Sequence, residues 1–450
     1  MDDRKKAQIV ASIIKQNNTI TLTTKSKDGK VWSTKVFYGE KGSEIYVILE
    51  KDGHAFSNIL ENSEVFFVIE RNDPMAFIQG EGVAEVLGKA SDLEERSIVT
   101  RKNLQIVPFL RMNPDTYLVK IKMKRIWVSY FYEGWMPRIE IVIDDNFSKM
   151  LANELTKTSK IPLIIQSTRP WALPATIAAV IFGTLISPTI DFLKFSLAFI
   201  GAILVHLGVN AFSDYFDYKK GADKWYTLGS SRVLVEGLLK PKEVLFVGIV
   251  LILLSLIVGL LIVYLTNFNR VLIYLILIGG VLGIFYAFIP IGWKYVGMGD
   301  LAVFLAWTGV AFGSYFVQTL TLNTNIILAS LPLSLLIVAI LHGNNMRDID
   351  DDKRAGYFTL ASLLGKNLSK YYYLLLILSA YVIFVLNVVL GILPVWALAA
   401  LLSIPVAYRN VLWAFRDNYV QKGMLDLYTA NLVSQFSILL IVGMVISRIL

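Results

Sequence analysis

Two clusters of acidic and amide residues have the spacing needed to bind a divalent metal ion. Both contain the pattern Asn-x-x-x-Asp, and their members are Asn210, Asp214, Asp217 and Asp223 in the first cluster and Asn344, Asn345, Asp348 and Asp352 in the second. The shared pattern suggests an internal repeat. Both clusters lie in a strongly apolar half of the chain, at the predicted ends of membrane helices. Carboxylates are costly there and by default indicate a functional site.

Each cluster places its oxygen-bearing side chains on one helix face, because positions i, i+3, i+4 and i+7 share a face. The residues with this spacing are Asn210, Asp214 and Asp217, and then Asn345, Asp348 and Asp352. Mg²⁺ prefers octahedral oxygen coordination and is usually bound by one or two carboxylates together with substrate phosphates. Two such faces would hold Mg²⁺ ions around a diphosphate and neutralise it as a leaving group, which is the difficult part of ionising an allylic C–O bond.

Residues around the clusters favour this interpretation. Basic side chains that would complete a diphosphate site are Lys224, Arg232, Lys294, Arg347, Lys353 and Arg354. An apolar bundle would hold a long hydrocarbon chain and keep water from a carbocation. The alternative is that the acids are solvated caps of helix ends. For His206 and His342, about one turn before each cluster, we expect polar packing in the bundle, with contact to an acceptor substrate as the alternative.

The composition is that of a membrane protein preceded by a domain of soluble character. The chain has 450 residues, of which 55% are hydrophobic. From about residue 170 onward, apolar stretches of bilayer-spanning length recur. We expect about nine spans, at 171–188, 195–212, 243–265, 271–290, 300–320, 326–342, 371–391, 394–412 and 428–448. The absence of cysteine excludes disulfides, thiolate metal sites and a Cys nucleophile.

Lysine and arginine residues gather in the loops after the even-numbered spans, which predicts that these loops face the cytoplasm. Both acidic clusters fall on that side. The charged start of the chain, Met1 to Lys6, has no apolar core behind it, so we expect no signal peptide and a cytoplasmic N-terminal domain. The net charge of +8 is explained by these loops, and we expect no nucleic-acid partner.

The first 140 residues predict a small closed β-barrel with few helices. Helices are expected at 3–16, 54–61 and 91–103, and Asp28-Gly29 is a hairpin signal. Six strands are expected, at 19–24, 31–38, 45–49, 65–70, 76–87 and 117–131. The predicted organisation is therefore a barrel domain at 1–140, a linker at 141–165 and an all-α transmembrane bundle at 166–450.

Residues 166–450 resemble the UbiA superfamily of intramembrane prenyltransferases, which have nine membrane helices and two Asp-rich motifs. The stretch from Asn210 to Asp223, with Gly229-Ser230-Ser231-Arg232 after it, is similar to the menaquinone-type branch that prenylates 1,4-dihydroxy-2-naphthoate. The second motif, from Asn344 to Gly356, fits the same superfamily. Relatives often have a basic residue after Ala-Gly, whereas this chain has Tyr357-Phe358; Lys353 or Arg354 would take over that contact.

The resemblance implies a membrane enzyme that transfers a polyprenyl group from its diphosphate to an aromatic acceptor in quinone biosynthesis. Mg²⁺ would be bound by Asp214, Asp217, Asp223, Asp348 and Asp352. Arg347 and Lys294 would contact phosphate, and Asn210 and Asn345 would assist coordination. The other substrate-binding residues expected are Arg169, Arg232, Tyr286, Lys353 and Arg354.

The N-terminal domain resembles the pyridoxamine-phosphate-oxidase-like split barrel through Gly53-His54 to Asn62 and Gln79 to Gly82. This resemblance makes FMN a candidate cofactor, with Ser33, Thr34 and Lys35 as candidate phosphate contacts. Because Ala55 stands where relatives often have lysine, a cofactor-free accessory or dimerisation module is the alternative.

Three other functions remain open at this point. A relative of the same superfamily would transfer geranylgeranyl to a glycerol-phosphate lipid. A membrane-anchored, flavin-dependent quinone reductase would use the barrel for catalysis and the bundle only for binding. A transporter is disfavoured, because the acidic residues lie on one predicted side with no relay across the bilayer.

Overall fold

A computed structural model describes residues 2–70, 75–156, 160–227, 229–288, 292–356, 358–416 and 423–450. The chain forms two compact units, Met1–Lys160 and Ile161–Leu450. Tyr357, one of the two residues noted after the second cluster, lies outside the described residues.

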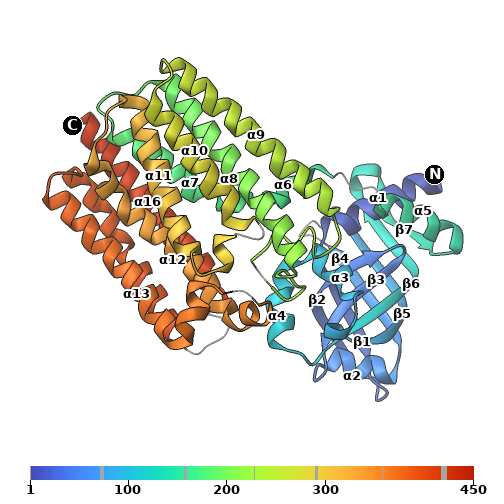
Figure 1. The fold of residues 1–450 in the computed structure, drawn as a ribbon. Coiled ribbons are helices and arrows are strands. Elements are labelled where there is room, and N and C mark those ends of the chain that lie inside the picture. Colours follow the sequence, from blue (N-terminus) through green and yellow to red (C-terminus); the bar gives the residue numbers. More distant parts are fainter. Residues whose placement is uncertain are drawn as a thin grey trace. The chain divides into compact units, whose positions relative to one another are not determined.

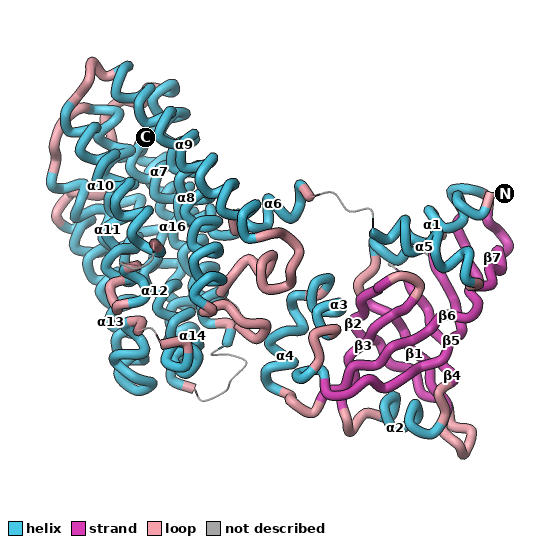
Figure 2. Tube along the Cα trace, turned by 45° about the vertical axis from the view of Figure 1, so that its right-hand side comes forward, coloured by secondary structure: helices cyan, strands magenta, loops and turns pink. Residues whose placement is uncertain are grey.

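The first unit is a closed antiparallel barrel (Figure 2, magenta). Its strands are β1 (Thr19–Lys25), β2 (Val31–Lys41), β3 (Glu44–Glu50), β4 (Glu64–Glu70), β5 (Ala76–Lys89), β6 (Thr116–Tyr130) and β7 (Trp135–Val142). They are ordered β3-β2-β1-β4-β5-β6-β7, and a β3–β6 pairing closes the barrel. All six predicted strands are present. The seventh, β7, pairs with β6 and was not predicted.

Helices cover parts of this barrel. They are α1 (Asp3–Gln16), α2 (His54–Glu61), η1 (Ala90–Asp92), α3 (Arg96–Lys102), η2 (Leu104–Ile106), α4 (Val107–Met112), η3 (Phe131–Glu133) and α5 (Asp145–Thr156). The helices predicted at 3–16 and 54–61 are confirmed. The third, predicted at 91–103, is shorter and is interrupted by a turn.

The linker prediction for 141–165 is wrong for its first half. Residues Asp145–Thr156 form α5, which packs on α1. Phe147, Leu151 and Leu155 are buried in the same core as the barrel strands. Their i, i+4, i+8 spacing is that of an amphipathic helix, so the apolar face needs a partner surface and the segment joins the barrel unit.

A buried ion pair joins α3 to β2 in this unit. Lys102 Nζ lies 2.6 Å from Glu40 Oε2, with both side chains largely buried. Burial raises the pKa of Glu40 and lowers that of Lys102, despite their mutual attraction. The cost of removing the two charges from water therefore offsets most of the free energy that their attraction contributes.

We expect Lys102→Met to lower the free energy of unfolding of the full chain by roughly 3 kcal/mol, because it leaves Glu40 buried without its cation. The double variant Glu40→Gln/Lys102→Met should lose much less. Thermal unfolding of the purified full-length protein measures both. Equal losses in the single and double variants would contradict this account.

The second unit is a helical bundle (Figure 1). Its helices are α6 (Ile161–Ser167), η4 (Pro170–Ala172), α7 (Leu173–Ile186), α8 (Phe192–Lys220), α9 (Pro241–Leu265), α10 (Arg270–Ala287), η5 (Trp293–Tyr295), α11 (Gly299–Thr319), α12 (Thr324–Arg354), α13 (Leu360–Val389), η6 (Val395–Ser403), α14 (Ile404–Phe415) and α16 (Leu425–Ile449). Among the described residues, eight helical segments are long and apolar enough to span a membrane. The bent pair Ile161–Ser167 and Pro170–Ile186 makes a ninth.

Packing within the bundle is centred on α12. This helix contacts α7, α11, α13 and α16, and about two thirds of its most apolar window is buried. In contrast, α9 and α10 expose about half of their apolar side chains, including Leu253, Ile257, Leu260 and Leu277. Surfaces of this kind match lipid, so the second unit is a multi-pass membrane domain.

Candidate active site

The first acidic cluster is brought together at the end of α8 and the loop that follows. Asp214 and Asp217 lie on the last two turns of the helix. Gly221 then ends it in a left-handed conformation (φ 73°), and the chain turns back toward Asp223. Carboxylate oxygens of all three aspartates lie within 4.8 Å of one another. Oxygen donors are the ligands that Mg²⁺ prefers, so these carboxylates could hold the ion, with water or phosphate completing its octahedral shell.

Two contacts hold Asp214, which is 2% exposed. The guanidinium of Arg169 pairs with Asp214 Oδ1, and the backbone N–H of Ser231 donates to Oδ2 at 3.0 Å. Arg169 adopts a left-handed conformation (φ 51°), a strained backbone of the kind found at functional sites. The Arg169 Nε and Ser231 Oγ atoms are buried without a partner in the described structure. A bound anion would supply the missing acceptors.

Asp217 is held by the loop between α10 and α11. Lys294 Nζ lies 2.6 Å from Asp217 Oδ2 and also donates to Ser213 Oγ at 2.6 Å. The Tyr295 hydroxyl donates to Asp217 Oδ1 at 2.8 Å. Lys294 was predicted from the sequence, whereas Tyr295 was not. Only the folded loop shows that the neighbouring side chain reaches the same carboxylate.

The second acidic cluster occupies the last turns of α12 and is organised by Arg347. This buried guanidinium donates to both oxygens of Asp348, at 3.0 and 2.7 Å, and to Asp426 Oδ2 at 2.9 Å. It also bonds the side-chain oxygen of Asn344. Asp426 belongs to α16, far along the chain, and no motif in the sequence pointed to it.

The remaining predicted residues of this cluster divide into a buried and an exposed group. Asn345 and Asp352 are buried, and Thr359 Oγ1 donates to Asp352 Oδ2 at 3.1 Å. Lys353 and Arg354 are exposed, and Arg354 pairs with Asp351 at 3.5 Å. The buried members are therefore placed to act with the cluster, whereas Lys353 and Arg354 need a rearrangement to do so.

Loop contacts connect the two clusters. The Phe358 N–H donates to the Tyr295 carbonyl at 3.0 Å, and Val296 and Phe358 form a short parallel bridge. Tyr295 thus reaches Asp217 through its side chain while its backbone holds the segment that contacts Asp352. In addition, a Cβ at Gly229 would lie 3.6 Å from the Asn344 amide. These contacts bring the loops beside the two motifs, which are distant in sequence, together in the bundle.

Arg232 does not face the acidic cluster through its described contacts. It is 4% exposed and donates to the carbonyls of Thr227 and Trp225, both at 2.8 Å, and to Glu236 at 2.5 Å. These bonds fold the loop that carries Ser231. These bonds give Arg232 a loop-forming role, while its buried Nε has no partner among the described residues, so the direct contact with substrate stays a prediction.

Two further predicted residues line the same end of the bundle. Asn210 donates to the Thr168 carbonyl at 3.2 Å, which ties α8 to the segment before Arg169. The ring centroid of Tyr286 lies 5.6 Å from Lys294 Nζ. Both residues therefore lie beside the first cluster. Asn210 bonds the backbone next to Arg169, and Tyr286 lies near Lys294.

Crowding of the carboxylates has an electrostatic consequence at Asp223. Burial and the nearby charge of Asp217 raise the pKa of Asp223 to about 7 from 3.8. Because the folded pKa is raised, ionising this carboxyl costs folding free energy as the pH rises from about 4 to about 7. A bound cation would relieve that cost, since metal binds the ionised form.

We therefore expect the affinity for Mg²⁺ to fall as the pH is lowered through about 7, and Asp223→Asn to flatten this dependence. The measurement is the shift in unfolding temperature with Mg²⁺ at several pH values, which needs no catalysis. A pH-independent shift in the wild-type protein would contradict the expectation.

The fold and site together define a multi-pass membrane enzyme with a polar, acidic site at one end of its helices. Residues 172–431 match the family described as "UbiA prenyltransferase family", and residues 7–130 match "Pyridoxamine 5'-phosphate oxidase". The chain belongs to the UbiA prenyltransferase family and carries an N-terminal pyridoxamine-phosphate-oxidase-like domain.

Individual relatives agree with this family. The chain is 33% identical to "UbiA prenyltransferase domain-containing protein 1" of Danio rerio, over 50% of this chain and 68% of that protein. It is 29% identical to "1,4-dihydroxy-2-naphthoate octaprenyltransferase" of Bacillus subtilis, over 65% of this chain and 94% of that protein. A solved structure titled for digeranylgeranylglyceryl phosphate synthase aligns over 64% of this chain and 99% of its own, with 21% identity and a TM-score of 0.47.

Proposed function

We propose that this protein transfers a polyprenyl group from polyprenyl diphosphate to an aromatic acceptor resembling 1,4-dihydroxy-2-naphthoate, with Mg²⁺, on the cytoplasmic side of the membrane. The observation that carries the proposal is the cluster of Asp214, Asp217 and Asp223 beside Arg169 and Lys294. Carboxylates and cations so close together suit a metal–diphosphate complex, in which each charge is neutralised.

In this proposal the residues of the site have the following roles. Asp214, Asp217 and Asp223 would hold Mg²⁺, which supplies charge neutralisation of the leaving diphosphate when bound. Arg169 and Lys294 would lie against the diphosphate and keep the carboxylates oriented before it arrives. Asp348 and Asp352 would serve the second metal position, with Arg347 and Thr359 fixing their orientation. The apolar bundle would exclude water from the allylic cation.

The aromatic acceptor is favoured by the relatives. The Bacillus subtilis relative is named for 1,4-dihydroxy-2-naphthoate and matches this chain over 94% of its own length. Nucleophilic attack by such a ring on the allylic carbon, followed by loss of a proton or of carboxylate, restores the aromatic system. The competing acceptor is a glycerol-phosphate lipid, which would attack through a hydroxyl.

The test is prenyl transfer in detergent from labelled geranylgeranyl diphosphate, with and without Mg²⁺, to the naphthoate and to a glycerol-phosphate lipid. Product on the naphthoate that requires Mg²⁺ supports the proposal. Product only on the lipid would assign the protein to ether-lipid synthesis. Absence of product with either acceptor would overturn the prenyltransferase assignment for this chain.

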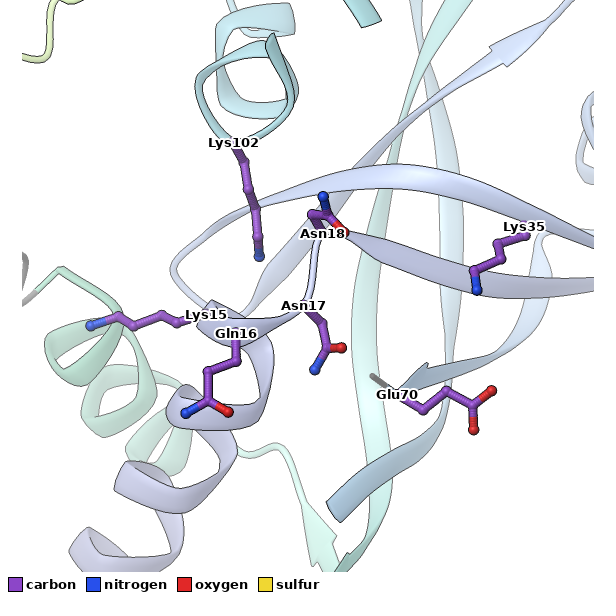
Figure 3. Close-up of a pocket in the computed structure, with 7 residues that line it drawn as sticks. All are labelled: Lys15, Gln16, Asn17, Asn18, Lys35, Glu70 and Lys102. Atoms are coloured by element: carbon purple, nitrogen blue, oxygen red, sulfur yellow. The ribbon is translucent and has the colours of Figure 1, made fainter. Parts of the chain in front are cut away.

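A flavin phosphate would need a polar pocket, and the N-terminal barrel contains one. The pocket is lined by Lys15, Gln16, Asn17, Asn18, Lys35, Glu70 and Lys102 (Figure 3). Lys15 and Lys102 donate to the carbonyl of Glu154 and the carboxylate of Glu40, both at 2.6 Å. Ser33, a candidate phosphate contact, bonds Thr23 on the exposed strand surface.

Among the described residues, Lys35 lines this pocket, but Lys15 and Lys102 bond the protein's own oxygens and Ser33 lies on the outer surface, so the lining does not fit a phosphate group and we derive no step through FMN. We propose instead that the barrel is an accessory module, with dimerisation as its candidate role. An absorption spectrum of the purified protein tests the flavin alternative directly, since bound FMN is yellow.

A further inference from the structure

A polar group lies deeper in the bundle than the acidic clusters, where three mutually packed helices meet. It consists of Thr176 on α7, His206 on α8 and Trp307 on α11. Thr176 Oγ1 and His206 Nδ1 are 2.5 Å apart. The His206 and Trp307 rings lie edge to face, with centroids 5.5 Å apart and an interplanar angle of 89°.

This group offers unused hydrogen-bonding capacity. Trp307 Nε1 is buried and has no hydrogen-bond partner among the described residues. A buried donor left unpaired is destabilising, so one that persists needs an explanation. His206 Nδ1 is hydrogen-bonded to Thr176 Oγ1, and His206 Nε2 has no partner among the described residues. An N–H and a ring nitrogen are thus available to a ligand.

His342 provides the contrast within the same bundle. Its Nδ1 lies 3.1 Å from Asp300 Oδ2 and its Nε2 lies 3.2 Å from the Ser369 carbonyl. The side chain is completely buried. Both ring nitrogens are therefore satisfied by the protein, which is what polar packing predicts. In His206, by contrast, only one of the two ring nitrogens has a partner among the described residues.

The depth of the group suits the acceptor substrate. His206 precedes Asp214 by eight residues on α8, which places it about 12 Å deeper along the helix axis. Trp307 lies eight residues into α11, at a similar distance from the end of that helix. In the proposed function, the diphosphate and the first prenyl carbon would occupy the space next to the carboxylates. The attacking ring carbon must lie within about 3.5 Å of that carbon, and the rest of a fused ring system then extends from that point toward this group.

We propose that His206 and Trp307 form the subsite that recognises the oxygen substituents of an oxygenated, fused-ring aromatic acceptor. Trp307 Nε1–H donates to one ring oxygen of the acceptor, and His206 Nε2 bonds a second oxygen. Thr176 orients the imidazole. The inference rests on the proposed function, because it requires an aromatic substrate that reacts at the acidic cluster.

The test uses steady-state prenyl transfer by the full-length protein with 1,4-dihydroxy-2-naphthoate and with two analogues that each lack one hydroxyl. Trp307→Phe keeps an aromatic ring, although a smaller one, and removes the N–H. Thr176→Val releases His206, and the exposed Trp396→Phe is the matched control for the change from indole to phenyl. We expect Trp307→Phe to raise the acceptor KM about threefold to tenfold, the value of one hydrogen bond. KM for prenyl diphosphate and the Mg²⁺ requirement should not change.

Discrimination between acceptors supplies the decisive readout. Wild type should distinguish the full acceptor from the analogue that lacks the bonded oxygen, and Trp307→Phe should treat the two alike. If Trp307→Phe and Thr176→Val both leave the acceptor KM and this discrimination unchanged, the subsite is refuted while the proposed function stands. A variant that raises the KM of both substrates equally refutes it too, since the role would then be structural. Failure of wild type with every aromatic acceptor refutes the proposed function itself.

Discussion

Asp214→Asn and Asp217→Asn should each lower kcat/KM for prenyl transfer by about 10³-fold or more, because each removes a charged metal ligand from the centre of the site. Asparagine keeps the size of the side chain but replaces one acceptor oxygen by a donor amide, so the hydrogen bonds to that oxygen are lost together with the charge. The loss would therefore report charge and coordination, with little contribution from packing. Both residues are also the partners of cations, Arg169 and Lys294, which would then face the site without a carboxylate.

The measurement is the initial rate with labelled polyprenyl diphosphate, together with the thermal shift caused by Mg²⁺ and inorganic diphosphate. Asp350→Asn is the matched control. Asp350 lies on α12 next to the second cluster, but it is 54% exposed and pairs with Lys366 on the surface. We expect the control to retain activity and the thermal shift, and the two site variants to lose both. A site variant that keeps the shift would show that its carboxylate does not bind metal.

Among the single substitutions proposed in the helical unit, Arg347→Met should lower the free energy of unfolding the most. The guanidinium is 4% exposed and pairs with Asp348 and Asp426, so its removal takes this cation away from one buried and one partly buried carboxylate. Breaking a buried pair from one side costs roughly 3–5 kcal/mol. Thermal unfolding in detergent, without substrates, measures the effect.

The control for this prediction is Arg354→Met. Arg354 lies on the same helix and also pairs with an aspartate, but its side chain is 73% exposed, so we expect almost no change in stability. Adding Asp426→Asn to Arg347→Met should recover part of the loss, because one unpaired charge is then removed. If Arg347→Met abolishes transfer but leaves the unfolding temperature unchanged, Arg347 acts on the phosphate, as the sequence motif suggested.

Local patterns in the sequence were sufficient for the broad architecture. Apolar stretches of bilayer length predicted the spans, and alternation of apolar residues predicted β1 to β6, because these signals depend only on each segment and its solvent. The linker prediction failed at Phe147, Leu151 and Leu155 because their helical spacing was overlooked. The acidic members of the site could also be found this way, since carboxylates in an apolar chain are conspicuous.

Only the tertiary structure decided how those carboxylates are held. Asp426 and Tyr295 have no motif of their own and acquire a role because folding places them against Arg347 and Asp217. Arg232 looked equivalent to the other basic residues in sequence, but the loop buries it against Glu236. The sequence by itself therefore determined the elements and the chemical groups. The pairing of those groups depended on contacts between distant segments, which no local pattern encodes.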